Sequence, residues 1–469
     1  MTRTLITGGL VVCPGGAVRA DLLVSDGRIA GLADPPAGWE ADERINADGL
    51  VVLPGAIDGH THFMLLDPEL GEPDPDEFEG FTNGGRGAAA GGVTTCVEMP
   101  QGFPPATNGL IHRRKRELAE RDAIVDFALW GGVRGGQTAQ EVFEQIDAGA
   151  AGFKALMCNS DPTFAGVDDA QLLATLEVLR ETPLMLGLHA ESDALLQNGL
   201  RRMAQAGRRD PLAHAESRPP MIEIEAVNRA VFFAEQTGGW VHIIHLSTPE
   251  AAELIGRARS RGVRATCETC PQYLVLDLDD LARLGPYARC APAIRDRGRV
   301  ERMWEYVADG TIDAITSDHC GFTVESKERG RADIFAAPNG LTGIQTLLPL
   351  VVSEGRRRGL SWERIAELTA TGPARLWQLA PRKGAIRLGA DADLVLLDPE
   401  RVWTVHPGEL LHTHRWTPYE GRQLRGRVVR TLVRGVTVYR DDAPERILVE
   451  PGFGRFVPAQ ATATAATVG

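Results

Sequence analysis

Short apolar runs alternate with helical patterns through the middle of the chain. A run of apolar residues bounded by turn residues predicts a strand, and apolar residues at helical spacing predict a helix. Residues 168–180 show the helical spacing, and Asp168 can cap the start of that helix. Eight strands alternating with helices predict a parallel α/β fold closed into a (β/α)8 barrel. The predicted strands are 56–57, 94–97, 127–129, 153–156, 184–188, 241–244, 264–267 and 314–316.

The two ends of the chain have a different pattern. Apolar and polar residues alternate in short stretches over residues 4–53 and again over 388–439, with a hairpin signal at Asp26-Gly27. We expect both ends to fold together into one small β-sandwich domain. The expected domains are the sandwich, residues 1–53 and 384–457, and the barrel, residues 54–383. Residues 458–469, rich in Ala and Thr, are expected to be a frayed, disordered tail.

Composition narrows the class of protein. The chain has 469 residues, 43% of them hydrophobic, which is ample for a large core. It contains no stretch of about 18 uninterrupted apolar residues, so we expect no membrane helix. Its first residues lack the charged region and apolar core of a signal peptide. A cytoplasmic protein is therefore expected. The seven dispersed cysteines suit a reducing compartment, and we interpret Cys267 and Cys270 as buried thiols rather than a zinc or redox pair.

Charge argues against nucleic acid as a partner. The net charge is −13, and basic residues are scattered. The densest basic runs, Arg113–Arg116 and Arg356–Arg358, fall in predicted helices and are interpreted as solvated faces.

Four predicted strands end in side chains that bind metals, and a fifth carries a lone lysine. The carboxyl ends of barrel strands meet at one mouth, where active sites lie. His60 and His62 are two residues apart, so that they point to the same side and can share a metal. A single histidine at such a position is more often structural, but the full set predicts a binuclear metal centre. Its six residues are His60, His62, Lys154, His189, His245 and Asp318.

Lys154 lies between apolar Phe153 and Ala155. It could pair with a carboxylate. Alternatively, if the lysine is buried next to cations, its pKa would fall. The neutral amine could then add carbon dioxide to become N6-carboxylysine, which can bridge two metals. Asp318 is predicted to bind the first metal and to act as the catalytic base that later protonates the leaving nitrogen. His319 is expected to be a hydrogen-bonding neighbour. Zinc is the leading metal, with manganese, cobalt and iron as alternatives.

The chain resembles the cyclic amidohydrolases of the amidohydrolase superfamily, over about residues 4–440. This resemblance implies that the six residues above hold two divalent metal ions and that the substrate is a small cyclic amide. It also implies a homo-oligomer, a tetramer or a dimer. The motifs that carry it are Pro54-Gly-Ala-Ile-Asp58-Gly-His60-Thr-His62-Phe63, Gly91-Gly-Val-Thr-Thr95, Gly152-Phe-Lys154, His189-Ala-Glu191, His245-Leu-Ser247 and Ser317-Asp318-His319.

Within that group, allantoinase-like motifs are the most abundant, including Glu98-Met-Pro100 and Thr417-Pro-Tyr-Glu-Gly421. Allantoin, a substrate of purine catabolism, is therefore the leading substrate. Met64 replaces the arginine of dihydroorotase-like enzymes, and the loop after Lys154 lacks the tyrosine of hydantoinase-like enzymes. A 5-substituted hydantoin or other cyclic imide is the alternative, because residues 63–66 could form an apolar wall. Predicted substrate contacts are Met64, Cys158, Asn159, Ser160, Cys290, Asn339 and Gly340.

Two other kinds of protein share this fold. A non-catalytic scaffold typically lacks metal ligands, whereas all six positions are filled here. A deaminase-like enzyme with one metal is disfavoured by the apolar flanks of Lys154. The metal content per chain separates the three hypotheses.

Overall fold

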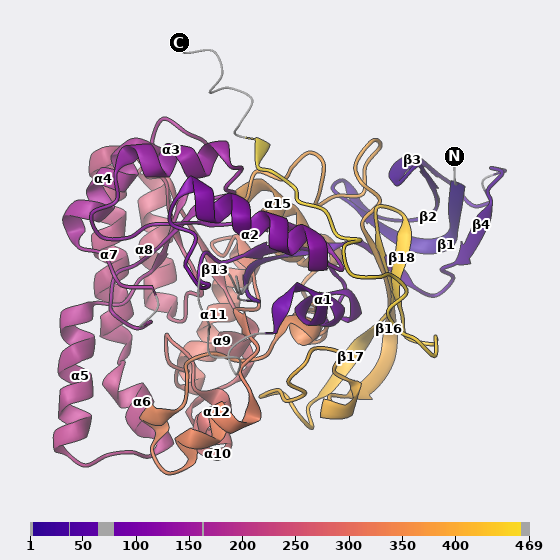
Figure 1. Ribbon diagram of the computed structural model, residues 1–469. Helices are drawn as coiled ribbons and strands as arrows, with labels where there is room; N and C mark the ends of the chain where they lie inside the picture. The colour runs from indigo at the N-terminus through magenta and orange to yellow at the C-terminus, as the bar shows by residue number, and fades with distance from the viewer. Residues whose placement is uncertain (1–2, 37, 64–78, 162–163, 461–469) are drawn as a thin grey trace.

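The structure is a computed structural model that describes residues 3–36, 38–63, 79–161 and 164–460 (Figure 1). Figure 1 shows a helix-rich body that contains α4, α5, α7 and α8, and beside it a sheet that contains β1–β4 and β16–β18. Both ends of the chain contribute strands to this sheet.

The parallel strands of the middle region form an eight-stranded barrel. Hydrogen bonds join them in the orders β15-β6-β7-β8 and β9-β10-β11-β12-β13-β14. β8 continues into β9 through Trp130, and β14 continues into β15 through residues 316–318, so the two sets close into one ring. Each predicted strand overlaps an observed one, and the predicted barrel is confirmed. The bounds are β6 Ala56–His62, β7 Val93–Glu98, β8 Asp126–Leu129, β9 Gly131–Gly132, β10 Phe153–Leu156, β11 Leu186–His189, β12 Val241–Ile243, β13 Ala265–Thr269, β14 Ala314–Ile315 and β15 His319–Cys320.

Helices connect these strands and cover the barrel. Polar residues cap many of them, as in α4, where the Asp168 carboxylate accepts a hydrogen bond from the backbone N–H of Gln171, as predicted. The helices are α1 Gly80–Ala90, α2 Gly109–Asp122, α3 Ala139–Asp147, α4 Asp169–Leu179, α5 Asp193–Gln205, α6 Pro211–Ser217, α7 Pro220–Thr237, α8 Pro249–Ser260, α9 Pro271–Val275, α10 Leu278–Leu284, α11 Arg297–Asp309, α12 Val324–Glu328, α13 Leu347–Arg357, α14 Trp362–Ala366 and α15 Gly372–Leu376.

The two ends of the chain meet in one β domain, as predicted. Where a sandwich was predicted, hydrogen bonds join all of its strands into one eight-stranded sheet. Its order is β18-β17-β16-β5-β1-β2-β3, with β4 paired to β1. The turn between β2 and β3 is at Asp26-Gly27, where both residues have positive φ. The sheet has its own apolar core, to which Leu22, Val52 and Leu394 belong. The strands are β1 Arg3–Cys13, β2 Gly16–Ser25, β3 Arg28–Ala33, β4 Glu43–Asn46, β5 Val51–Pro54, β16 Leu394–Thr404, β17 Gln423–Val433 and β18 Val436–Arg440.

After β18 the chain returns to the barrel. The backbone N–H of Phe127, in β8, donates to the Arg455 carbonyl at 3.0 Å, and the N–H of Val457 donates to the Phe127 carbonyl at 2.7 Å. The Phe456 ring packs on the Phe127 ring, with centroids 5.7 Å apart. Gln460 donates its N–H to the Gln378 carbonyl. The predicted tail therefore begins on the barrel surface, while residues 461–469 lie outside the described part, and the proposed domain bounds stay a prediction.

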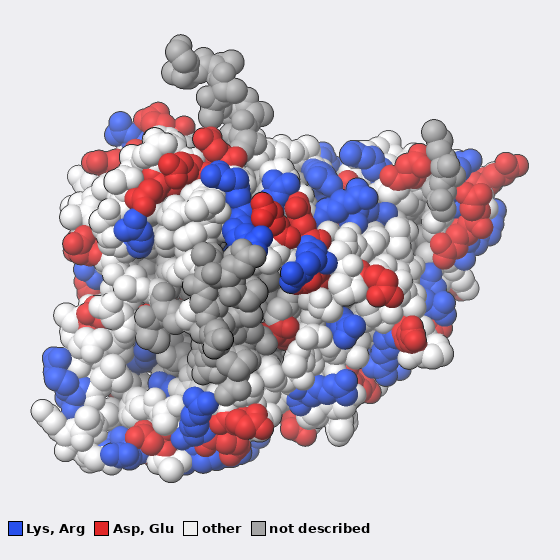
Figure 2. All heavy atoms as spheres, viewed as in Figure 1, with Lys and Arg blue, Asp and Glu red and all other residues white. Residues whose placement is uncertain are grey.

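The distribution of surface charge and the state of the cysteines agree with what the composition predicts. Acidic and basic side chains are interspersed over the face seen in Figure 2. Among the described residues, no helix is both long and apolar enough to cross a membrane. Cys267 and Cys270 are buried free thiols, as expected.

Candidate metal centre and active site

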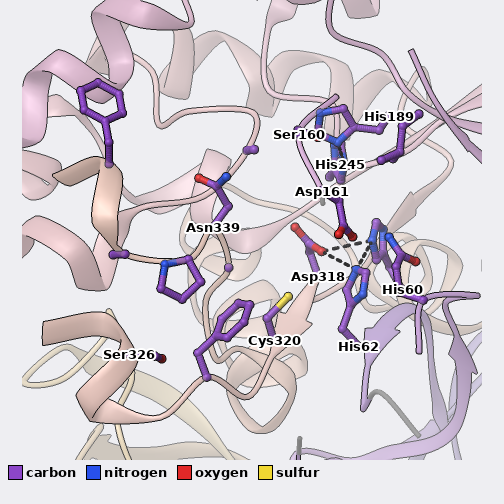
Figure 3. A pocket seen from close by; sticks show the side chains of 18 of the residues that line it. His60, His62, Ser160, Asp161, His189, His245, Asp318, Cys320, Ser326 and Asn339 are labelled. Atoms are coloured by element: carbon purple, nitrogen blue, oxygen red, sulfur yellow. Dashed lines mark hydrogen bonds and ion pairs between the residues drawn. The ribbon is translucent and has the colours of Figure 1, made fainter. Parts of the chain in front are cut away.

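The six predicted residues come together at the carboxyl end of the barrel (Figure 3). They line one cavity of about 440 Å³. Because this end collects the last residues of every barrel strand, side chains far apart in sequence become neighbours. His60 and His62 come from β6, Lys154 from β10, His189 from the end of β11, His245 from the turn after β12, and Asp318 from the break between β14 and β15.

The ring nitrogens of the histidines converge in two groups. In the first, His60 Nε2 lies 3.2 Å from His62 Nε2, and both lie within 3.4 Å of Asp318 Oδ1. In the second, His189 Nδ1 lies 2.9 Å from His245 Nε2. The His60 and His245 rings are 5.4 Å apart, so the two groups are adjacent. Figure 3 shows His60, His62 and Asp318 pointing toward one another, with His189 and His245 beside them.

Buried carboxylates orient the histidines from behind. His60 Nδ1 lies 2.7 Å from Glu268 Oε1, and donating to it leaves the Nε2 lone pair directed at the site. His189 Nε2 lies 2.8 Å from Glu191 Oε2, which leaves Nδ1 directed at the site. Burial acts to raise the pKa of Glu268, but its contacts with His242 and His60 lower it to about 2. Arg218 forms an ion pair with Glu191. Sequence reasoning assigned no role to either glutamate.

Lys154 is buried and lines the same cavity as the two histidine groups. Its Nζ lies 3.8 Å from Met99 Sδ, and its charge acts on His62, His189 and His245. Burial is the largest influence on the lysine and lowers its pKa to about 8. The neutral amine, which is the form that can react with carbon dioxide, is therefore far more populated near neutral pH than in an ordinary lysine.

Asp318 is held by its backbone in an uncommon conformation. Its φ is 50°, and that of His245 is 39°, both in the left-handed region. The adjacent Ser317 donates its backbone N–H and its hydroxyl to Asp58, which fixes the break between β14 and β15. Although burial acts to raise the pKa of Asp318, the neighbouring histidines hold it well below its usual value. The carboxylate is therefore ionised near neutral pH.

His319 points away from this centre, as expected. Its Nε2 lies 2.5 Å from Glu79 Oε2, and its Nδ1 accepts a hydrogen bond from the Gly343 N–H at 3.1 Å. Since both ring nitrogens are engaged, His319 is a hydrogen-bonding neighbour of the site.

The predicted substrate contacts divide into two groups. Ser160, Asn339 and Gly340 line the cavity. Cys158, Asn159 and Cys290 are not among its described lining residues, and the Cys290 carbonyl instead accepts a hydrogen bond from His214. Met64 lies outside the described residues, and so does most of the predicted apolar wall at residues 63–66. The cavity nevertheless has an apolar side, formed by Leu156, Ala291, Phe322, Phe335, Ala336, Ala337 and Pro338.

This donor set fits divalent metal ions. Ligand atoms of His60, His62 and Asp318 lie within 4.8 Å of one another. Imidazole nitrogens with lone pairs directed inward, an ionised carboxylate and carboxylates behind the histidines are the usual environment of a bound metal in proteins.

Comparison with known proteins supports this geometry. The chain is 41% identical over 459 residues to an allantoinase from Rubrobacter xylanophilus, covering 97% of each chain. It is 36% identical to an L-hydantoinase from Paenarthrobacter aurescens, covering 97% of this chain and 98% of that one. The solved structure of L-hydantoinase from Arthrobacter aurescens superimposes with a TM-score of 0.92 at 35% identity, covering 98% of this chain and all of the other. The amidohydrolase family matches residues 51–438. The chain therefore belongs to the amidohydrolase family of metal-dependent hydrolases.

Proposed function

We propose that this enzyme opens a cyclic ureide by hydrolysing an amide bond of the ring, with allantoin, converted to allantoate, as the leading substrate. The main support is the convergence of all six predicted residues on one cavity of about 440 Å³, a volume that suits a small ring. The similarity to curated allantoinases over nearly the full chain favours allantoin among such rings.

His60 and His62 would hold one divalent metal, and His189 and His245 the other. Lys154 would join them as N6-carboxylysine, a proposal supported by its burial and its pKa of about 8. Asp318 would be a further ligand of the first metal. When bound, the metals lower the pKa of a water molecule and polarise the ring carbonyl. Zinc is our leading candidate for both positions.

The side chains of this protein position and move the proton. The Asp318 carboxylate, ionised at rest, takes a proton from the attacking water and passes it to the ring nitrogen as the C–N bond breaks. Glu268 and Glu191 keep the histidine rings in the tautomers that the site needs. Asn339, in the cavity wall beside Gly340, would contact the amide of the ring through its backbone.

A 5-substituted hydantoin is the second candidate substrate. Phe322 and Phe335 give the cavity an apolar side that suits an aryl or alkyl substituent better than the polar ureido group of allantoin. The similarity to an L-hydantoinase supports the same alternative.

The test is ring opening of allantoin, hydantoin, 5-phenylhydantoin, dihydrouracil and dihydroorotate by purified, metal-reconstituted protein. We expect the highest kcat/KM with allantoin. A higher value with 5-phenylhydantoin would favour the second candidate. Protein that binds metal but opens none of these rings would contradict the proposal, and protein that binds no metal would indicate a scaffold. A homo-oligomer, dimer or tetramer, and a cytoplasmic location stay predictions.

A further inference from the structure

Lys327, in α12, is a fully buried lysine next to the cavity that the proposed reaction does not use. Its ammonium donates three hydrogen bonds to backbone carbonyls: to Gly340 at 2.9 Å, to Pro338 at 3.1 Å and to Arg289 at 3.4 Å. An ammonium has three N–H donors, so this arrangement uses all of them. Pro338 and Gly340 belong to the wall of the cavity, and Arg289 lies two residues before Ala291, another wall residue.

This lysine lacks the partner that a buried cation usually has. Among the described residues, no carboxylate lies within ion-pair distance of Lys327, and the Trp416 ring centroid is 5.4 Å from its Nζ. Burial lowers the pKa of Lys327 to about 7. A buried charge without a counter-ion destabilises a fold, and a methionine would fill similar space without that penalty. Lys327 therefore contributes through the position in which its three hydrogen bonds hold the backbone of the cavity wall.

The hydrogen bond to Pro338 determines which way the next peptide N–H points. The bond between Pro338 and Asn339 is trans, so its C=O and N–H point in opposite directions. With the Pro338 carbonyl directed at Lys327, the Asn339 N–H points away from Lys327. That N–H makes no hydrogen bond within the described part of the chain, and Asn339 lines the cavity.

The rest of this wall is tightly packed. Gly340 has φ of 145°, and its N–H donates to the Arg289 carbonyl at 3.0 Å. A Cβ on Gly340 would lie 2.6 Å from Cys320 Cβ, so no side chain fits there. At Gly340 the wall is therefore formed by the backbone alone, and this backbone is what Lys327 bonds.

We propose that Lys327 is a positioning residue that fixes the peptide plane between Pro338 and Asn339, and thereby aims the Asn339 N–H at an acceptor on the substrate ring. This inference rests on the proposed function, because the ring is the group that would accept the hydrogen bond.

The experiment compares K327M and K327Q with the wild type on the best substrate of the panel above, using metal-loaded protein. A misplaced contact made in both ground and transition states raises KM more than it lowers kcat. For K327M we expect kcat/KM to fall about 100-fold, mostly through KM, at unchanged metal content. K327Q keeps two N–H donors, and we expect a smaller loss, about tenfold. If K327M does not fold, the comparison of K327Q with the wild type tests the inference.

K383M is the matched control. Lys383 is also fully buried, but its partners are carboxylates at the other end of the barrel. K383M should lower stability and leave the KM of the folded enzyme unchanged, whereas K327M should raise KM. A KM for both Lys327 variants within about twofold of the wild type would overturn the inference.

The crystal structure of K327M separates this inference from the proposed function. If the wild type opens no ring, the proposed function fails, and the backbone of residues 338–340 then decides the inference alone. We expect the Pro338–Asn339 peptide plane to rotate in K327M. An unchanged plane would overturn the role of Lys327, whatever the activity of the wild type.

Discussion

The barrel carries a buried cluster of charged groups at each end, and the two clusters are balanced differently. At the amino end, Lys383 Nζ lies 2.5 Å from Asp126, 3.0 Å from Asp391 and 2.7 Å from Asp393. Arg434 also pairs with Asp126. Every carboxylate there has a cation from the chain itself. This cluster joins β8 of the barrel to the segment leading into β16, and its role is structural.

The carboxyl-end cluster is not balanced in this way. Two of its four histidines, His60 and His189, direct lone pairs inward, and its one lysine has a pKa lowered to about 8. Its nitrogen and oxygen ligand atoms converge as they do around a bound cation, which agrees with the metal dependence of the amidohydrolase family. The comparison shows that a group of buried carboxylates does not by itself indicate a metal, because a lysine can pair with all of its members. The carboxylates of Asp126, Asp391 and Asp393 also lie within metal-binding distance of one another, but Lys383 occupies the space between them.

The largest expected effect is that of D318N. The amide cannot accept a proton from water, so kcat should fall at least about 1,000-fold while metal content stays close to that of the wild type. Steady-state kinetics and elemental analysis on the same preparation measure both quantities. A near-native kcat would rule out Asp318 as the base.

K154A should have the second-largest effect. Without the N6-carboxylysine, the metal content should fall from about two ions per chain to one or less, and the activity should fall by about 100-fold. Added short carboxylic acids should restore part of the activity by replacing the missing carboxylate. Two tightly bound metals in K154A would show that Lys154 does not bridge them.

K383M tests the amino-end cluster. Removing this lysine leaves Asp391 and Asp393 buried with fewer cations, and the free energy of unfolding should fall by about 3–5 kcal/mol. Urea denaturation followed by circular dichroism measures that change. Because the cluster is at the far end of the barrel, kcat/KM of the folded enzyme should not change. A loss of metal from K383M would mean that the two ends are coupled.

The smallest effect is on the pH dependence of stability. Burial acts to raise the pKa of Asp391, but Lys383 and Arg382 together lower it below its usual value. A carboxyl group with a lowered folded-state pKa stabilises the protein above its unfolded pKa, about 3.9, and this stabilisation is lost as the pH falls. The free energy of unfolding should therefore drop more steeply below about pH 4 in the wild type than in K383M. Parallel curves would contradict this account.

The fold and the six residues of the centre could be predicted because the signal is local. Each barrel strand is a short apolar run, and its last residue is fixed at the mouth by the topology of a parallel barrel. The strand ends are less well predicted, since tertiary hydrogen bonds decide where a strand stops. Most differ by one or two residues, but β6 runs to His62, five residues beyond its predicted end.

The buried residues behind the metal-binding histidines could not be predicted, because their partners are far away along the sequence. Glu268 lies 208 positions from His60 along the chain, and nothing in its immediate sequence indicates that contact. Local sequence also fails to indicate the contacts of Lys115. It falls in a basic run that was predicted to be a solvated helix face, which is wrong for this residue. It is buried and donates to the carbonyls of Met99 and Gln101.

The return of the chain to the barrel after β18 has a practical consequence. Residues 455–457 bond to Phe127, the second residue of β8, so this segment lies at the end of the barrel opposite to the cavity. A tether that attaches the protein to a solid support beyond Gln460 would start from that end. Protein immobilised in this orientation would keep the mouth of the barrel facing the solution, where a cyclic substrate can enter freely.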